Sequence, residues 1–303
     1  MKRTIAILDT GLPDTAAIRK LWRGFSFERL DLCGGGNYHP HGSLVANLCF
    51  RPFDTDQLRD TVHFIHIRCG DEKGQFSEDN INRAFDLLWQ KNATSANCSW
   101  GGPPPADESH RRMAEKILAI ADGGVAFHFA AGNDGDSNPD DDISMPQSLL
   151  RRGTGTYLWG ALEKEGKPAW FSSDGMKLFA SMWGADRPAH GPDGLIAGVS
   201  GTSFASPTGC GMCEALLALE QFPSYEALEE NMIAVAINLT KKKDGTWTEY
   251  QDPETGIKWH PKVGAGSLEH FFQGLTASAR CRPVKVPAAA VRWFNFRRLE
   301  LKT

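Results

Sequence analysis

Short apolar runs alternate with amphipathic stretches along most of this chain, and this alternation limits the folds open to it. Strand-like runs occupy residues 4–8, 61–69, 94–100, 125–130 and 156–162, and helical patterns occupy residues 77–91, 111–121, 203–220 and 224–237. Strands that alternate with helices indicate a parallel sheet covered by helices on both faces. We therefore predict an α/β fold with three layers, α/β/α, and a mostly parallel central sheet.

Polar residues mark where several helices should begin. Asp14 is placed to cap a helix that extends to about Trp22, and Ser77 and Ser224 are placed to cap two later helices. Other polar residues mark where strands should end: Asp9, Ser99 and Asn133 each lie at or just past the end of a predicted strand. Because ligand sites of such folds lie at the carboxyl ends of the strands, these three residues are candidates for one site.

Composition excludes several classes of protein. The chain has 303 residues, 41% of them hydrophobic, which is enough for one large core. A net charge of −4 gives no reason to expect a nucleic-acid partner. No apolar stretch reaches the roughly 18 residues of a membrane span, and the start of the chain lacks the long apolar run of a secretory signal. We expect a cytoplasmic protein that binds neither membrane nor nucleic acid.

The seven cysteines are consistent with a cytoplasmic location. Their number is odd, and a chain of this length needs no disulfides to fold. Cys210 and Cys213 have the spacing of a zinc or redox motif, but they fall inside a predicted helix with no second pair elsewhere. We interpret them as small, buried, apolar residues.

Four short segments contain side chains suited to nucleophilic catalysis. They are Ile7–Gly11, His41–Ala46, Ala130–Asn133 and Gly201–Pro207. A serine hydroxyl is a weak nucleophile at neutral pH and needs an adjacent base. With Asp9, His41 and Ser203 in this order along the chain, the four segments together resemble the subtilisin-like serine protease family, the subtilases.

The resemblance implies a role for each of four residues. Ser203 would be the nucleophile, His41 its base, and Asp9 the group that orients the imidazole and stabilises its charged form. Asn133 and the backbone N–H of Ser203 would donate to the oxyanion, at the start of a helix whose dipole favours negative charge. No metal or other cofactor enters this chemistry.

The resemblance also implies how a protein or peptide substrate binds. The segment Asn97–Gly102 is similar to the family's edge strand, where Ser99, Trp100 and Gly101 would bind an extended peptide through main-chain hydrogen bonds. Ala131 and Gly132 would form one wall of the pocket for the substrate side chain. For Trp100, a place in the core and a place in a substrate subsite remain equally open.

Further similarities set the domain limits. Residues 169–175 resemble the family's Phe-Ser-Ser segment, and residues 263–268 resemble its closing glycine-rich strand. We assign residues 1–272 to a peptidase domain and residues 273–303 to a basic C-terminal extension. Two departures stand out: Thr208–Gly211 replaces the usual His-Val-Ala-Gly, which should alter helix packing but not the triad, and the expected Ala-Pro-Gly is missing near residues 180–184.

Two features bear on regulation. We expect no propeptide before the domain, so a latent protease that needs a regulatory protein partner is an alternative to a freely active one. The basic extension either packs on the acidic body or docks such a partner. The loop Asp134–Asp142 contains five aspartates and is interpreted as solvated, with calcium binding as the alternative.

The same residues disfavour three other functions. A binding module that has lost turnover is disfavoured by the intact set Asp9, His41, Asn133 and Ser203. An aspartic protease would need a second Asp-Thr-Gly, which the chain lacks. A lipase or esterase would need Gly-x-Ser-x-Gly, but the residue two places after Ser203 is Ala205.

Overall fold

A seven-stranded sheet forms the centre of the molecule, with the strand order β2-β3-β1-β4-β5-β6-β7. Every neighbouring pair in it is parallel. The structure is a computed structural model, and it describes residues 2–102, 107–135, 144–150, 153–164, 166–175, 177–230, 250–251 and 258–259. The predicted class, three-layer α/β/α with a mostly parallel sheet, is confirmed.

The strands are β1 (Arg3–Asp9), β2 (Ser26–Asp31), β3 (Val62–Arg68), β4 (Ser95–Cys98), β5 (Ala126–Ala130), β6 (Thr156–Leu162), β7 (Leu178–Trp183), β8 (Arg187–His190), β9 (Ile196–Val199), β10 (Tyr250–Gln251) and β11 (Lys258–Trp259). The α-helices are α1 (Ala16–Leu21), α2 (His41–Phe50), α3 (Glu78–Gln90), α4 (Glu108–Asp122) and α5 (Thr202–Ala218). Three short 3₁₀ turns lie at Arg51–Phe53, Arg59–Thr61 and Gln147–Leu149. Helix also covers residues 225–230.

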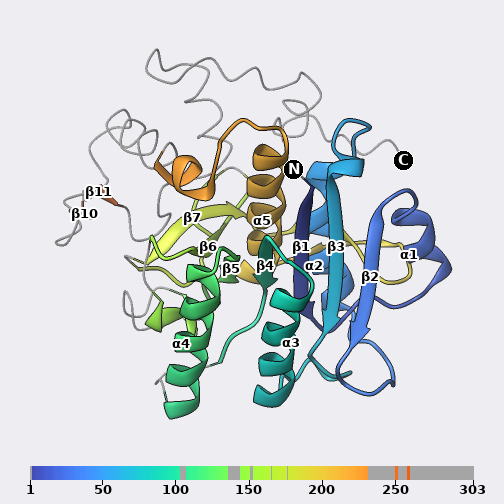
Figure 1. Cartoon of the computed structure of the whole chain (residues 1–303), viewed down its shortest axis with the longest axis horizontal. Coiled ribbons are helices and arrows are strands. Elements are labelled where there is room, and N and C mark those ends of the chain that lie inside the picture. The colour runs from blue at the N-terminus through green and yellow to red at the C-terminus, as the bar shows by residue number, and fades with distance from the viewer. Residues whose placement is uncertain are drawn as a thin grey trace.

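The strands β4, β5 and β6 are buried along their whole length because helices cover both faces of the sheet. In β1, Ala6 and Leu8 belong to one core cluster, whereas Ile5 and Ile7 belong to another. Figure 1 shows α3 and α4 in front of the sheet and α2 and α5 behind it. α5 crosses behind the middle strands, so its first turn reaches the edge of the sheet where β1, β4 and β5 end.

The predicted helix starts can be compared with the structure. Ser77 caps α3 as predicted, accepting a hydrogen bond from the backbone N–H of Asn80 at 3.2 Å. The prediction for Asp14 is wrong by one residue, because Thr15 caps α1 and Asp14 forms ion pairs with Arg19 and Arg29 instead.

Ser224 precedes the helical residues 225–230, and the backbone N–H of Ala227 donates to its hydroxyl. The predicted end of that helix near residue 237 lies outside the described residues. So do the glycine-rich segment 263–268, the domain boundary at 272 and most of the aspartate loop. Among the helices of the described residues, none is both long and apolar enough to cross a bilayer.

Candidate active site

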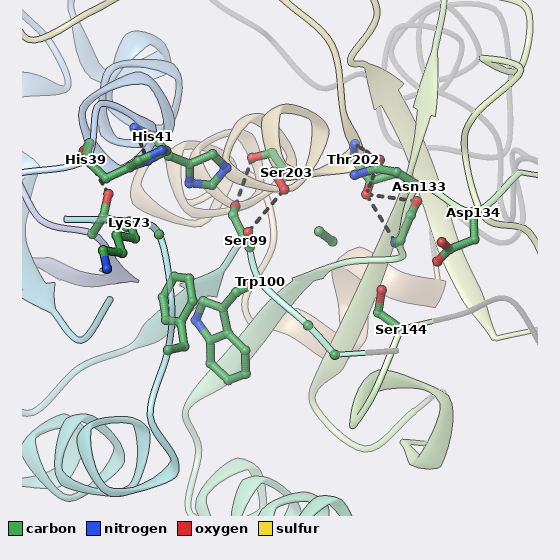
Figure 2. Close-up of a pocket in the computed structure, with 17 residues that line it drawn as sticks. His39, His41, Lys73, Ser99, Trp100, Asn133, Asp134, Ser144, Thr202 and Ser203 are labelled. Atoms are coloured by element: carbon green, nitrogen blue, oxygen red, sulfur yellow. Dashed lines mark hydrogen bonds between the residues drawn. The ribbon is translucent and has the colours of Figure 1, made fainter. Parts of the chain in front are cut away.

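The edge of the sheet at the carboxyl ends of β1, β4 and β5 gathers the predicted site residues. Asp9 is the last residue of β1, Ser99 follows β4 directly, and Asn133 lies three residues after β5. These strands are neighbours in the sheet. Figure 2 shows Ser99 and Asn133 facing a cleft together with His41 and Ser203, which lie on the first turns of α2 and α5.

Asp9 and His41 form a hydrogen-bonded pair. His41 Nδ1 lies 2.8 Å from Asp9 Oδ1, and the Asp9 side chain is 1% exposed against 23% for His41. The backbone N–H of Thr10 also donates to Asp9 Oδ1, at 2.7 Å. Because Asp9 accepts from Nδ1, the other ring nitrogen of His41, Nε2, is left to exchange a proton in the cleft.

Thr10 and Gly42 fix the position of His41. The Thr10 hydroxyl donates to the carbonyl of His39 at 2.9 Å and accepts from the backbone N–H of Gly42 at 2.8 Å, so it ties the end of β1 to the start of α2. A Cβ on Gly42 would lie 2.4 Å from the carbonyl oxygen of Gly11. This close approach requires glycine directly after His41.

Asp9 also sets the protonation of His41. Burial acts to lower the pKa of His41, but the charge of Asp9 and the hydrogen bond to it outweigh this effect, so the pKa lies above the ordinary value of 6.5. A raised pKa makes the imidazole a stronger base, which suits it to take a proton from a hydroxyl.

Ser203 is held against the strand segment that carries Ser99. Its hydroxyl donates to the carbonyl of Ser99 at 3.1 Å, and the Ser99 hydroxyl donates to the carbonyl of Ser203 at 2.9 Å. That carbonyl is free to accept because Pro207, four residues later in α5, has no backbone N–H. The proline of the Gly201–Pro207 motif therefore makes room for a contact between α5 and the sheet.

A buried polar chain continues behind Ser99. Asn97 donates through Nδ2 to the Ser99 hydroxyl at 2.9 Å, and it accepts through Oδ1 from the Ser206 hydroxyl at 2.8 Å. Asn97, Ser99 and Ser206 are all buried, so these bonds satisfy polar groups that would otherwise be costly. The chain of bonds links β4 to the first two turns of α5 and fixes the backbone of Ser203.

Asn133 points its amide group at the cleft. Its Oδ1 accepts from the backbone N–H of Thr202 at 2.9 Å and from the Thr202 hydroxyl at 3.1 Å. Since the oxygen is engaged on the side of α5, Nδ2 is left as a donor. The N–H of Ser203 is among the first of α5, which have no partner within the helix. Gly201, which precedes α5, has φ 153°, a conformation that favours glycine.

The Phe-Ser-Ser segment (residues 169–175) holds the loop that carries Asn133 through two hydrogen bonds. The backbone N–H of Asp134 donates to the Ser173 hydroxyl at 3.2 Å, and the Ser173 N–H donates to the carbonyl of Gly132 at 3.1 Å. Gly132 has φ 124°, and a Cβ there would lie 2.7 Å from the hydroxyls of both Ser144 and Ser173.

The predicted substrate-binding residues are mostly brought together. Ser99, Trp100, Gly101 and Gly132 line a cleft of about 460 Å³ with His41, Asn133 and Ser203. Trp100 packs in the core, where it is 8% exposed and donates from Nε1 to the carbonyl of Leu8, and it also lines the cleft. Ala131 is the exception: its side chain is buried in the core, and its neighbours Ala130 and Gly132 line the cleft instead.

The cysteine pair of α5 is buried, as predicted. Cys210 and Cys213 are 0% and 1% exposed, and burial raises the pKa of both thiols well above its ordinary value. Neither thiol lines the cleft.

Comparison with known proteins decides the family. The model of the subtilase family (Peptidase_S8) matches residues 2–253. The chain belongs to the subtilase family. It is 26% identical to subtilisin DY of Bacillus licheniformis over 243 residues, which cover 78% of this chain and 84% of that protein. It is 28% identical to proteinase T of Parengyodontium album over 226 residues, 71% of each chain.

Solved structures agree with this subtilase in fold. The prenylagaramide maturation protease PagA has a TM-score of 0.66 at 23% identity, covering 91% of this chain and 94% of that one. A cold-adapted subtilisin-like serine proteinase has a TM-score of 0.58 at 20% identity, covering 86% and 89%. With its family and its relatives, this subtilase is a serine endopeptidase that acts on proteins.

Several residues of the subtilase site were not singled out from the sequence. Thr202 and Thr10 sit inside the recognised motifs, but nothing in a motif tells which neighbour a hydroxyl will contact. Asn97 precedes Ser99 by two residues, so both side chains lie on the same face of an extended strand, and this spacing was the available signal. Lys73, on the loop after β3, also lines the cleft, and it comes from a segment that no motif includes.

Proposed function

We propose that this subtilase hydrolyses peptide bonds through a triad of Asp9, His41 and Ser203 and an oxyanion hole that includes Asn133. The observation that carries the proposal is the 2.8 Å hydrogen bond between the buried Asp9 and His41, at the mouth of the cleft that Ser203 lines. The raised pKa of His41 supports its role as the base.

The reaction has two halves. His41 Nε2 takes the proton of Ser203 as Oγ attacks the scissile carbonyl, and Asn133 Nδ2 and the Ser203 N–H donate to the resulting oxyanion. The imidazolium then gives its proton to the leaving amine, and the C–N bond breaks to leave an acyl-enzyme. Water, deprotonated by His41, attacks the ester, and the imidazolium then gives its proton to Ser203 Oγ as the C–O bond breaks, which releases the acid and restores Ser203.

We also propose a cytoplasmic site of action. All six cysteines that the structure describes are free, and four of them, Cys49, Cys69, Cys98 and Cys210, are completely buried. Unpaired thiols of this kind are typical of proteins that work in a reducing compartment. A fractionation of producing cells, with activity labelling of each fraction, tests this point.

A latent protease that needs a partner is the second candidate, and one observation favours it. The Ser203 hydroxyl donates to Ser99, and within the described residues it makes no hydrogen bond to His41. Rotation of the Ser203 side chain is therefore needed before proton transfer. This rotation would be caused either by substrate binding along the Ser99–Gly101 segment or by binding of a regulatory partner.

Cleavage of an unfolded protein by the purified full-length chain separates the two candidates. Casein turnover that disappears in Ser203→Ala supports a freely active endopeptidase. Absence of turnover by a folded chain, restored by extract of the producing cells, supports the latent form. Unchanged turnover in Ser203→Ala contradicts both.

A further inference from the structure

The active-site cleft has a charge pattern that the proposed reaction does not use. Among the described residues that line it, Lys73 is the only lysine or arginine and Asp134 is the only residue with a carboxylate. Figure 2 shows Lys73 on the same side of Ser203 as His39 and His41, and Asp134 on the opposite side, beyond Asn133. Both side chains are exposed, and neither forms an ion pair with another described residue.

A rigid turn positions Lys73. Gly70 and Phe76 form an antiparallel bridge, which brings the two ends of the turn together. Inside it, Asp71 Oδ1 accepts from the backbone N–H of Lys73 at 2.8 Å and from that of Gln75 at 2.9 Å. The backbone at Lys73 is thus fixed, while its ammonium group stays available.

The acidic neighbours of Lys73 in this turn do not face the cleft. Hydrogen bonds from the backbone of Gln75 and Lys73 lower the pKa of Asp71, so its carboxylate is charged, but it is turned into the loop and does not line the cleft. Gly74, which follows Lys73 in the turn, packs on His39: a Cβ at Gly74 would lie 3.7 Å from the His39 ring. The tip of the turn therefore lies beside His39, which is two residues before His41 in the sequence.

The geometry of an extended peptide tells which substrate residue meets Lys73. A peptide paired with Ser99–Gly101 presents successive side chains to opposite sides. The subtilase resemblance assigns Gly132 to the wall of the pocket for the acyl residue, whose carbonyl Ser203 attacks, so we place the side chain of that residue between Gly132 and Ser144, which line the cleft with Asp134. The side chain of the residue before the acyl residue must then point the other way, toward His41, His39 and Lys73.

We propose that Lys73 is a specificity-determining residue that selects peptides with an acidic side chain directly before the acyl residue. This inference rests on the proposed function, because it takes Ser203 as the attacking group. An opposite charge at Asp134 repels the same acidic side chain from the other side of the cleft, so the two charges favour one placement of the substrate.

Binding to the full-length Ser203→Ala protein tests the proposal without turnover. Two fluorescent peptides that differ only by Glu or Lys before the acyl residue are titrated at low salt. We expect the Glu peptide to bind about fivefold more tightly, as for an exposed ion pair set against an exposed repulsion. Lys73→Glu should invert the ratio, and 0.5 M salt should bring it close to one.

Lys20→Glu is the matched control. Lys20 is an exposed residue of α1 outside the cleft, and its replacement changes the net charge by the same amount. The ratio should not change in this variant. Equal binding of the two peptides, a ratio that survives Lys73→Glu, or binding of neither peptide at millimolar concentration would overturn the proposal. The proposed function is tested separately with an active-site probe that contains no peptide, so the two failures are distinguishable.

Discussion

Ser99 and Ser203 exchange two hydrogen bonds, each hydroxyl donating to the backbone carbonyl of the other residue, at 2.9 and 3.1 Å. Ser99 lies in the segment that we propose binds the substrate, and Ser203 lies in α5, the helix that we propose begins at the oxyanion hole. The two hydrogen bonds therefore hold the proposed nucleophile and the proposed substrate-binding segment together in the free protein. This arrangement depends on Pro207, which leaves the Ser203 carbonyl without a partner in the helix.

Removing the Ser99 hydroxyl should slow catalysis without removing any group of the triad. In Ser99→Ala the Ser203 carbonyl loses its partner, and a buried polar group left unpaired costs about 1–3 kcal/mol. We expect kcat to fall roughly tenfold as α5 shifts, with KM changed little. Ser206→Ala, which removes a hydroxyl one step further along the same chain of bonds, is the control and should retain more activity. Equal kcat in Ser99→Ala and the native enzyme would refute this role.

Asn133 should contribute to the transition state alone. Asn133→Ala removes one donor to the oxyanion, which costs roughly 2.7–4 kcal/mol in comparable sites, so kcat should fall by about 10² to 10³. Thr202→Val removes one of the two bonds that hold Asn133 Oδ1 but keeps the backbone N–H, and we expect a loss of about tenfold or less. Steady-state kinetics on one peptide substrate measure both. A rise in KM at constant kcat in Asn133→Ala would place this residue in ground-state binding instead.

The pH profile should follow His41. Only the neutral imidazole can take the proton of Ser203, so kcat/KM falls as the pH drops through the pKa of His41. Since Asp9 holds that pKa above 6.5, the midpoint of the acid limb in the free enzyme should also lie above 6.5. Asp9→Asn should move the limb to lower pH and reduce the maximal rate by about 10⁴. An acid limb below pH 6 in the native enzyme would contradict the pairing.

A buried ion pair at the opposite end of the sheet should matter for stability and not for chemistry. Glu214 in α5 is completely buried and accepts from Arg3, the first residue of β1, and from the Tyr225 hydroxyl. Burial acts to lower the pKa of Arg3, but Glu214 outweighs it and the pKa is raised. Glu214→Ala leaves Arg3 unpaired, which should lower the free energy of unfolding by about 3–5 kcal/mol.

Urea denaturation measures this change, with Glu115→Ala on the exposed face of α4 as the control. That control should stay within about 0.5 kcal/mol of the native protein. Below the unfolding transition, the fluorophosphonate reactivity of Glu214→Ala should match that of the native protein. A loss of reactivity equal to the loss of stability would mean that Glu214 also positions Ser203.

Much of this architecture could be predicted from the sequence because the signals are local. The helical period of apolar residues predicted α3, and a short apolar run predicted β6 with both of its ends correct. The parallel sheet follows from their alternation. The sequence indicated four candidate site residues together because each lies in a short motif whose chemistry limits the residues allowed: Asp9, His41, Asn133 and Ser203.

Other features depend on packing that the local sequence does not encode. β2, with Glu28 and Arg29 at its middle, is an edge strand whose partly buried side chains lack an apolar period. At Thr208–Gly211, where the family has His-Val-Ala-Gly, the helix packs closely on its neighbours: a Cβ at Gly209 would lie 2.4 Å from the Trp159 ring, and one at Gly211 would lie 2.2 Å from the Cys49 carbonyl oxygen. Trp159, fifty residues earlier in the sequence, thus requires glycine at position 209, and α2 requires glycine at position 211.

The most direct test of the account is reaction of the purified full-length protein with a fluorophosphonate probe, followed by mass spectrometry of the labelled peptide. The probe reports an activated serine and requires no knowledge of the substrate. We predict labelling at Ser203, lost in Ser203→Ala and in His41→Ala, with both variants folded by circular dichroism. Labelling at another serine, or labelling at Ser203 that persists in His41→Ala, would contradict the assignment of His41 as the base that activates Ser203.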